Sequence, residues 1–98
     1  MVKLLSVSPS DKPDKKLNVK LETDAGREKN IHIGAKGMED FTKTKDESQK
    51  ERYITRHRAR EDWRLSGALS SGFWARWLLW NKPTLRESVA DVRDRFNL

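Results

Sequence analysis

Residues 70–85 decide the fold, and they run from Ser70 to Leu85 as Ser-Ser-Gly-Phe-Trp-Ala-Arg-Trp-Leu-Leu-Trp-Asn-Lys-Pro-Thr-Leu. Three of the four tryptophans lie here, and each aromatic side chain removes about 150–250 Å² from water when it is buried. Apolar side chains recur at helical spacing and predict a short helix from about 69 to 80, with one stripe formed by Leu69, Phe73, Trp77 and Trp80. We expect this helix to be the centre on which the other elements pack, with one face left for a partner.

Two further helices are predicted, one on each side of this stretch. Pro83 ends the preceding helix and suits the first turn of the next, whose apolar stripe consists of Leu85, Val89, Val92 and Phe96. Upstream, Asp46 followed by Gln49 is typical of a capping box, which predicts a helix over residues 47–62. This second helix is mostly polar, and Tyr53 and His57 lie one turn apart on its narrow apolar stripe.

The N-terminal third has the two-residue period of strands. Residues 2–7 predict a first strand with Val2, Leu4 and Ser6 on one side, and a loop follows over 8–14. A hairpin over 17–33 is predicted from alternation in 17–22, a turn at 23–26 and a return strand over 28–33. The fold class is therefore α+β, with a small antiparallel sheet of two to three strands packed against three C-terminal helices. We expect a single domain over 1–98, with a β-rich part (1–33), a glycine-containing connection (34–45) and a helical part (46–98).

Composition limits the function classes. The absence of cysteine excludes disulfides, a thiol nucleophile and cysteine-ligated metals. The sequence has no run of about 18 apolar residues, so it predicts no membrane span. Residues 1–7 have the pattern of a strand rather than of a signal peptide. We therefore expect an intracellular, non-secreted protein. The net charge of +6 favours polyanionic partners, but the basic excess is spread evenly along the chain rather than gathered in one arm.

Candidate catalytic groups are few. On its helix stripe, His57 is predicted to be a hydrogen-bonded structural residue rather than a base or ligand, and His32 is predicted to pair locally with Asp40. The acidic pairs at 39/40 and 61/62 are adjacent in sequence, so on a helix they would not face each other. We therefore predict no enzyme activity, no catalytic residues, no metal site and no cofactor.

Several stretches together resemble a family of small uncharacterised proteins encoded by large DNA viruses of algae and protists and by some marine tailed phages. The most specific is Trp77-Leu-Leu-Trp-Asn-Lys-Pro-Thr-Leu85. The others are Ser8-Pro9, Asp14-Lys15-Lys16, His32 to Gly37, Asp40-Phe41-Thr42, Lys45-Asp46, Arg52-Tyr53-Ile54, Arg56-His57-Arg58, Glu61-Asp62-Trp63, Gly72-Phe73-Trp74, Arg76 and Arg95-Phe96. The resemblance covers about nine-tenths of the chain, although the family more often has an aromatic where Ile33 stands. It implies a viral origin without known enzymology, which favours a virion component or a host-interaction factor.

Two functions from different classes remain open. In the first, the chain is a non-enzymatic virion component, a minor capsid or core protein, that binds other viral proteins through its sheet edge or its tryptophan-rich helix, with candidate contacts at Phe73, Trp74, Arg76 and Trp77. In the alternative, it binds nucleic acid without sequence preference through Lys36, Lys50, Arg52, Arg56, Arg58 and Arg60. The Gly34–Gly37 amides would then add an anion-binding nest, unless the two glycines simply turn the chain. The expected location is the virion or the host cytoplasm or nucleus, and the oligomeric state is open.

Overall fold

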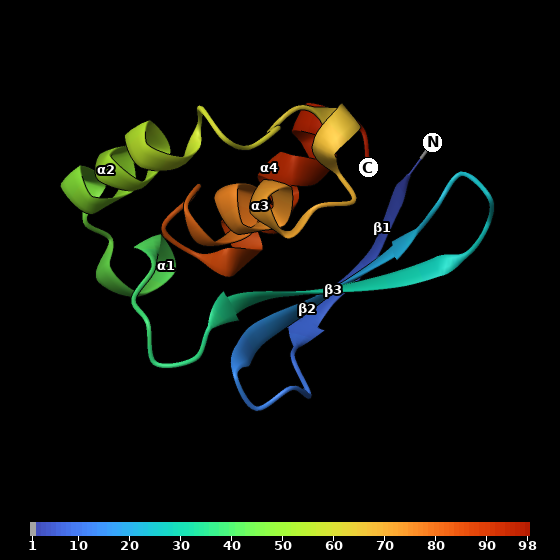
Figure 1. Cartoon of the computed structure of the whole chain (residues 1–98), viewed down its shortest axis with the longest axis horizontal. Helices are drawn as coiled ribbons and strands as arrows, with labels where there is room; N and C mark the ends of the chain where they lie inside the picture. The colour runs from blue at the N-terminus through green and yellow to red at the C-terminus, as the bar shows by residue number, and fades with distance from the viewer. Residues whose placement is uncertain (1) are drawn as a thin grey trace.

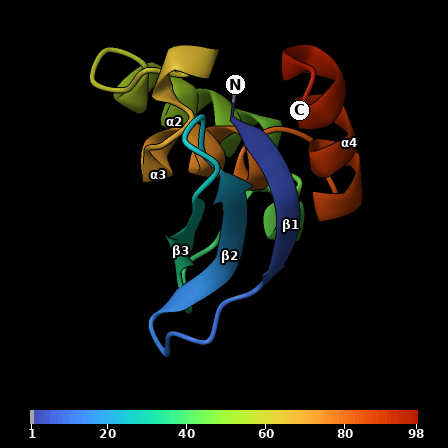
Figure 2. The same cartoon turned by 90° about the vertical axis from the view of Figure 1, so that its right-hand side faces the viewer.

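A computed structural model describes residues 2–98, and Met1 lies outside the described residues. Three antiparallel strands, β1 (Lys3–Pro9), β2 (Lys15–Glu22) and β3 (Glu28–Ala35), form one sheet in the order β1-β2-β3. The helices follow in sequence and cover one face of this curved sheet (Figures 1 and 2). The α+β fold class and the hairpin predicted over 17–33 are confirmed.

The first strand is longer than predicted and contains an irregularity. The pairing with β2 shifts between Leu4 and Ser6, so that Leu5 forms a bulge and is 42% exposed. A bulge reverses the inward and outward alternation beyond it. Val7, rather than the predicted Ser6, therefore packs on the core and pairs with Val19.

The helical part consists of more pieces than the three predicted. Asp40 caps a four-residue helix α1 (Phe41–Thr44) that was not predicted, and α2 (Glu47–His57) follows. A 3-10 turn η1 (Leu65–Gly67), the helix α3 (Ser71–Trp74), the π-helix η2 (Ala75–Leu79) and α4 (Leu85–Phe96) complete the chain.

The central tryptophan-rich segment is not one regular helix. Ser70 caps α3, so Leu69 lies outside it, and the chain widens into a π-turn in which the Trp80 amide donates to the Ala75 carbonyl at 3.2 Å. The extra residue in a π-turn rotates the side chains that follow. The stripe predicted from regular helical spacing is consequently broken between Trp74 and Trp80.

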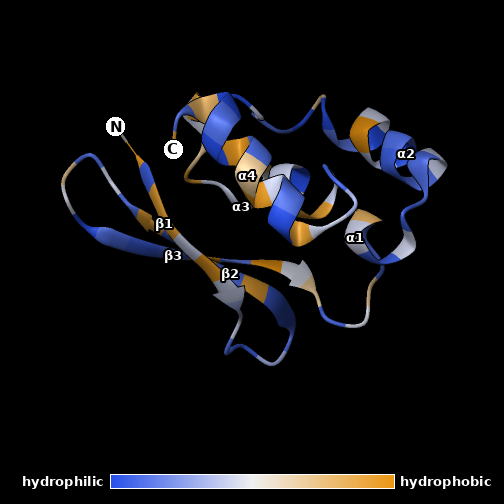
Figure 3. Ribbon diagram, turned by 180° about the vertical axis from the view of Figure 1, so that it is seen from behind, coloured by the Kyte–Doolittle hydropathy of each residue, from blue (hydrophilic) through white to orange (hydrophobic). Residues whose placement is uncertain are grey.

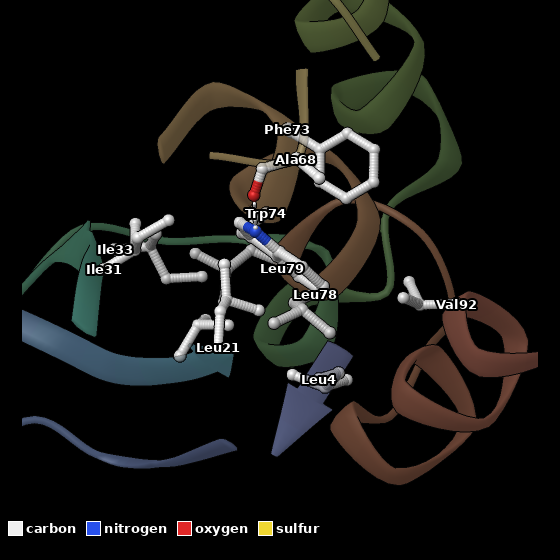
Figure 4. Close-up of a cluster of buried hydrophobic side chains, with 11 residues drawn as sticks. Leu4, Leu21, Ile31, Ile33, Ala68, Phe73, Trp74, Leu78, Leu79 and Val92 are labelled. Atoms are coloured by element: carbon white, nitrogen blue, oxygen red, sulfur yellow. Dashed lines mark hydrogen bonds between the residues drawn. The ribbon is translucent and has the colours of Figure 1, made fainter. Parts of the chain in front are cut away.

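The core lies between the sheet and the segment 68–79. Trp74 stands at its centre and donates its indole N–H to the Ala68 carbonyl at 2.7 Å (Figure 4). Around it lie apolar side chains from all three strands and from α4, including Leu4, Val19, Leu21, Ile31, Ile33, Phe73, Leu78, Leu79 and Val92. Trp74 and Phe73 are both fully buried, which places the densest aromatic sequence inside the molecule.

The last helix packs as its sequence pattern predicts. Val92 is fully buried, and the other three members of the predicted stripe, Leu85, Val89 and Phe96, pack against the core. Thr84 is the N-cap and accepts from the Glu87 amide, so Pro83 precedes the cap rather than occupying the first turn. Arg93 donates to the Leu4 carbonyl at 3.1 Å, which ties α4 to β1.

Candidate functional site

The helix α2 forms one wall of the candidate site. Asp46 begins it, since its carboxylate accepts from the Ser48 and Gln49 amides at 3.0 and 3.2 Å, as the capping pattern predicts. The predicted end at residue 62 is wrong, because α2 ends at His57. Beyond that point the Glu61 carboxylate bridges the His57 Nδ1 (3.1 Å) and the Trp63 indole N–H (2.9 Å). The chain therefore leaves the helix to bring Trp63 back towards it.

A column of stacked rings supports this wall from within. The Tyr53 ring lies between those of His57 and Trp80, with centroids 4.3 and 4.5 Å away. Burial, reinforced by the Glu61 carboxylate, raises the pKa of Tyr53 to about 12, so its phenol is neutral at physiological pH. His57 thus occupies the apolar stripe where it was predicted, with Glu61 as its hydrogen-bond partner.

A groove separates α2 from the loop that follows β3. We call it the loop–helix groove. It encloses about 400 Å³ and is lined by Gly37, Met38, Glu39, Gln49, Arg52, Arg56 and Trp80. A second hollow of about 360 Å³ continues from it, sharing Met38, Glu39, Arg56 and Trp80 and reaching Lys16, Tyr53 and His57.

Arg52 and Arg56 carry the positive charge of the groove. They lie one helical turn apart on α2, about 6 Å along its axis, and both are exposed. Neither makes an ion pair with any carboxylate of residues 2–98. Most of the α2 ribbon has the colour of hydrophilic residues in Figure 3, so these guanidinium groups belong to a polar helix. Two free, adjacent guanidinium groups are suited to binding anionic oxygens.

The other predicted phosphate contacts are not part of the groove lining. Arg58 and Arg60 are exposed but lie beyond the end of α2. Lys36 is exposed in the loop. Lys50 is engaged inside the molecule, where its ammonium donates to the Asn81 carbonyl at 2.7 Å and lies 4.7 Å from the centre of the Phe41 ring. Lys50 is therefore engaged in internal contacts and does not line the groove.

The glycine loop is built to turn the chain. Gly34 and Gly37 have φ of +77° and +86°, in the region that favours glycine. Two amides of the loop are already used, since Lys36 N–H donates to the Asp14 carbonyl and Met38 N–H to the Ala35 carbonyl. These amides are not available to an anion-binding nest, and the alternative of a simple turn agrees with the geometry.

The aromatic side chains that were predicted to contact a partner are largely buried in the structure. Phe73 and Trp74 have no exposed surface, so the partner contacts predicted at these two residues cannot form in this fold. Trp77 is partly buried, donates to the Trp63 carbonyl at 2.9 Å and lies between two guanidinium groups, those of Arg76 (4.4 Å) and Arg95 (4.5 Å). Burial, together with the charge of Arg95, lowers the pKa of Arg76.

The remaining polar candidates have local structural roles. His32 forms a hydrogen bond with Ser10 at 2.7 Å and not with the predicted Asp40, because it faces away from the core.

Within residues 2–98, no three His, Asp or Glu side chains gather closely enough to hold a metal ion. Over the same residues, no helix has the length and apolar character needed to cross a membrane.

Four groove residues were not predicted to belong to a binding site. Gln49 was assigned only to a capping pattern, Trp80 only to a helix stripe and Met38 only to a connection, and Glu39 was considered only as part of an acidic pair. Met38 is 63% exposed, the highest value among the large hydrophobic side chains that the structure leaves exposed. The sequence feature that could have identified Met38 is its position directly after Gly37, because a turn there leaves a large apolar side chain in solvent.

The loop–helix groove lies largely within a region that matches a known family. The model of a family of unknown function (DUF5754) matches residues 5–57, from β1 to the end of α2, and so includes the glycine loop, Arg52 and Arg56. No curated protein and no solved structure matches the chain. Because the match covers more than half of its length, the chain belongs to the DUF5754 family.

Proposed function

We propose that this protein is a non-enzymatic binding module that holds nucleic acid, without sequence preference, by the phosphates at its loop–helix groove. The observation that carries the proposal is the pair Arg52 and Arg56, exposed, one turn apart and without a carboxylate partner in residues 2–98. The net charge of +6 adds a general attraction to polyanions. Phosphate contacts of this kind give binding that is independent of sequence and sensitive to salt.

Paired double variants test the proposal. Arg52→Gln with Arg56→Gln removes two charges from the groove, whereas Arg58→Gln with Arg60→Gln removes two from the adjacent surface outside it. All four side chains are exposed, so both variants are expected to fold. Binding of a labelled oligonucleotide is measured by fluorescence anisotropy at about 50 and 200 mM salt. We expect the groove variant to lose about tenfold or more in affinity and the matched control less than about threefold.

The results separate a local site from general electrostatics. Equal losses in the two variants would mean that only net charge matters. No binding of wild-type protein at the lower salt concentration would exclude nucleic acid as the ligand. Circular dichroism spectra and melting temperatures of both variants check that the fold is retained.

A second candidate, binding to another protein, is favoured by an apolar hollow on a different part of the surface. It measures about 370 Å³, and Val2, Leu65 and Leu69 are among its lining residues. Leu69 is 45% exposed, which is typical of a contact residue. With the viral resemblance, the partner would be another virion protein, and the site would replace the Phe73 and Trp74 face. Leu69→Ser would then weaken co-purification with virion proteins while leaving nucleic-acid binding unchanged.

The β1 edge of the sheet is less suited to this second role than expected. The β1 edge is interrupted by the bulge at Leu5, and its Leu4 carbonyl is occupied by Arg93. Both features hinder the addition of another strand.

A further inference from the structure

We infer that the loop–helix groove takes a single strand rather than a duplex, with one nucleobase seated in the apolar gap between Met38 and Trp80. This inference rests on the proposed function and specifies its ligand. Met38 and Trp80 line both continuous hollows, one from the loop and one from the end of η2. An indole and a thioether offer the polarizable, apolar contacts that a base ring accepts.

The position of the aromatic ring supports a base-binding role. Trp80 is held in place by its stack on Tyr53, at 4.5 Å between centroids and 7° between planes. Trp80 is only partly buried and lines the groove, whereas Trp74 is fully buried and Trp77 lies between two arginines. Among these three tryptophans, Trp80 is thus the one placed beside free positive charge. In a duplex the base faces are hidden by stacking, so only an unpaired base can enter such a gap.

The charges on the two walls of the groove determine which wall the phosphate backbone of the strand follows. Arg52 and Arg56 lie on the α2 wall, and Glu39 lies on the loop wall without a cationic partner among residues 2–98. A phosphate backbone is attracted to the first wall and repelled from the second. The backbone therefore follows α2, and the bases project towards Met38. An acidic peptide would satisfy the two arginines equally well, but its acidic side chains have no ring to fill the gap beside Trp80.

The test compares a single strand with a duplex. Oligothymidine of about 15 nucleotides, within the range that one small binding domain covers, and a duplex of equal length are titrated by anisotropy at about 50 mM salt. We expect the single strand to bind about tenfold more tightly. Met38→Ser should weaken single-strand binding by roughly three- to tenfold and leave duplex binding within about twofold, because it removes base contact but no charge.

Two further variants serve as controls. Glu39→Gln removes the repulsive carboxylate and should strengthen binding of both ligands by roughly two- to fivefold. Leu69→Ser removes another exposed apolar side chain, one that lies outside the groove, and should change neither affinity. Met38 is largely exposed, so the variant at that position is expected to fold.

The outcomes distinguish this inference from the proposed function. Equal affinity for single strand and duplex, or an unchanged single-strand affinity in Met38→Ser, would overturn the inference while leaving the arginine site intact. Displacement of the oligonucleotide by poly-glutamate as effectively as by unlabelled oligothymidine, at equal charge, would also overturn it and indicate an acidic protein partner. Loss of the difference between the two arginine double variants would instead overturn the proposed function.

Discussion

Lys16 Nζ lies 2.6 Å from Asp40 Oδ2, and this ion pair ties β2 to the loop that forms one wall of the groove. The same ammonium group donates to the Met38 carbonyl, so it contacts both ends of the segment 38–40. The second oxygen of Asp40 accepts from the Thr42 amide at 2.9 Å and begins α1. The pair is largely shielded from water, since the side chains are 13% and 3% exposed. The position of Met38 and Glu39 therefore depends on a strand some 22 residues earlier in the chain.

Replacing Asp40 with Asn tests this ion pair through the pH dependence of stability. Burial acts to raise the pKa of Asp40, but hydrogen bonds from Lys16 and Thr42 and the charge of Lys16 outweigh it and hold the pKa below its ordinary value. A lowered folded-state pKa stabilises the fold above the unfolded pKa, and this contribution is lost as the pH falls through the folded pKa. We expect Asp40→Asn to reduce the free energy of unfolding by about 1–3 kcal/mol at pH 7, with the difference shrinking below about pH 4.

Asp46→Asn is the matched control for that experiment. Asp46 is also an N-cap, but it is exposed and makes no ion pair within residues 2–98, and Asn caps a helix about as well as Asp. Its variant should follow the wild-type stability profile from pH 7 to pH 3 in denaturant titrations. If the profile of Asp40→Asn also runs parallel to that of wild type, the ion pair does not contribute as argued.

The sheet and the last helix were predictable because their patterns depend on nearby residues. Alternation predicted β2 and β3, and the spacing of Leu85, Val89, Val92 and Phe96 predicted α4. The Lys16–Asp40 pair was not predictable, because charged residues make up 37% of the chain and many pairings satisfy the sequence equally well. The loop–helix groove was not predictable for the same reason, since it depends on residues that are distant in the sequence. Arg52 and Arg56 were identified, but the walls that distinguish them from Arg58 and Arg60 arise only when the loop, α2 and Trp80 meet.

How deeply each tryptophan is buried was also not predictable from the sequence. The predicted stripe contained Trp77, while Trp74 and Leu78 lie on a neighbouring apolar row, and helical spacing alone could not decide which of the two faces the sheet. A π-turn at Ala75–Leu79 interrupts the regular helical period after Trp74, and nothing in the sequence pattern predicts it. In the structure Trp74 is central, whereas Trp77 lies at the margin of the core.

Alanine variants of Trp74 and Trp77 test which of the two contributes more to the free energy of unfolding. Trp74→Ala removes a fully buried ring and leaves the Ala68 carbonyl without its donor, so it should cost about 3–5 kcal/mol of unfolding free energy. Trp77→Ala should cost at least about 1 kcal/mol less, because Trp77 is only partly buried. Urea unfolding followed by circular dichroism gives both values. Equal losses, or a larger loss for Trp77→Ala, would contradict the arrangement of the core.

Gly34 and Gly37 should respond differently to alanine, although both have positive φ. A Cβ at Gly37 meets nothing within 4 Å, so Gly37→Ala should cost only the backbone strain of about 1–2 kcal/mol. A Cβ at Gly34 would lie 3.0 Å from Leu79 Cδ1 and 3.1–3.2 Å from the Lys16 side chain. Gly34→Ala should therefore cost about 1 kcal/mol more, because it also disturbs the residue that pairs with Asp40. Thermal unfolding of the two variants compares them, and a greater loss at Gly37 would contradict the packing of the loop.

The salt dependence of binding gives the sharpest test of which arginine contacts phosphate. Each phosphate neutralised by a cation contributes about 0.7–0.9 to the slope of log K against log salt, because a condensed counterion is released. Arg56→Gln should therefore lower the slope by about that amount for oligothymidine, whereas Arg58→Gln, which removes an equal charge outside the groove, should lower the intercept slightly and keep the slope. Titrations at four salt concentrations between about 50 and 200 mM measure both. A slope that falls equally in the two variants would place phosphate on the whole basic surface, and then the groove would have no privileged role.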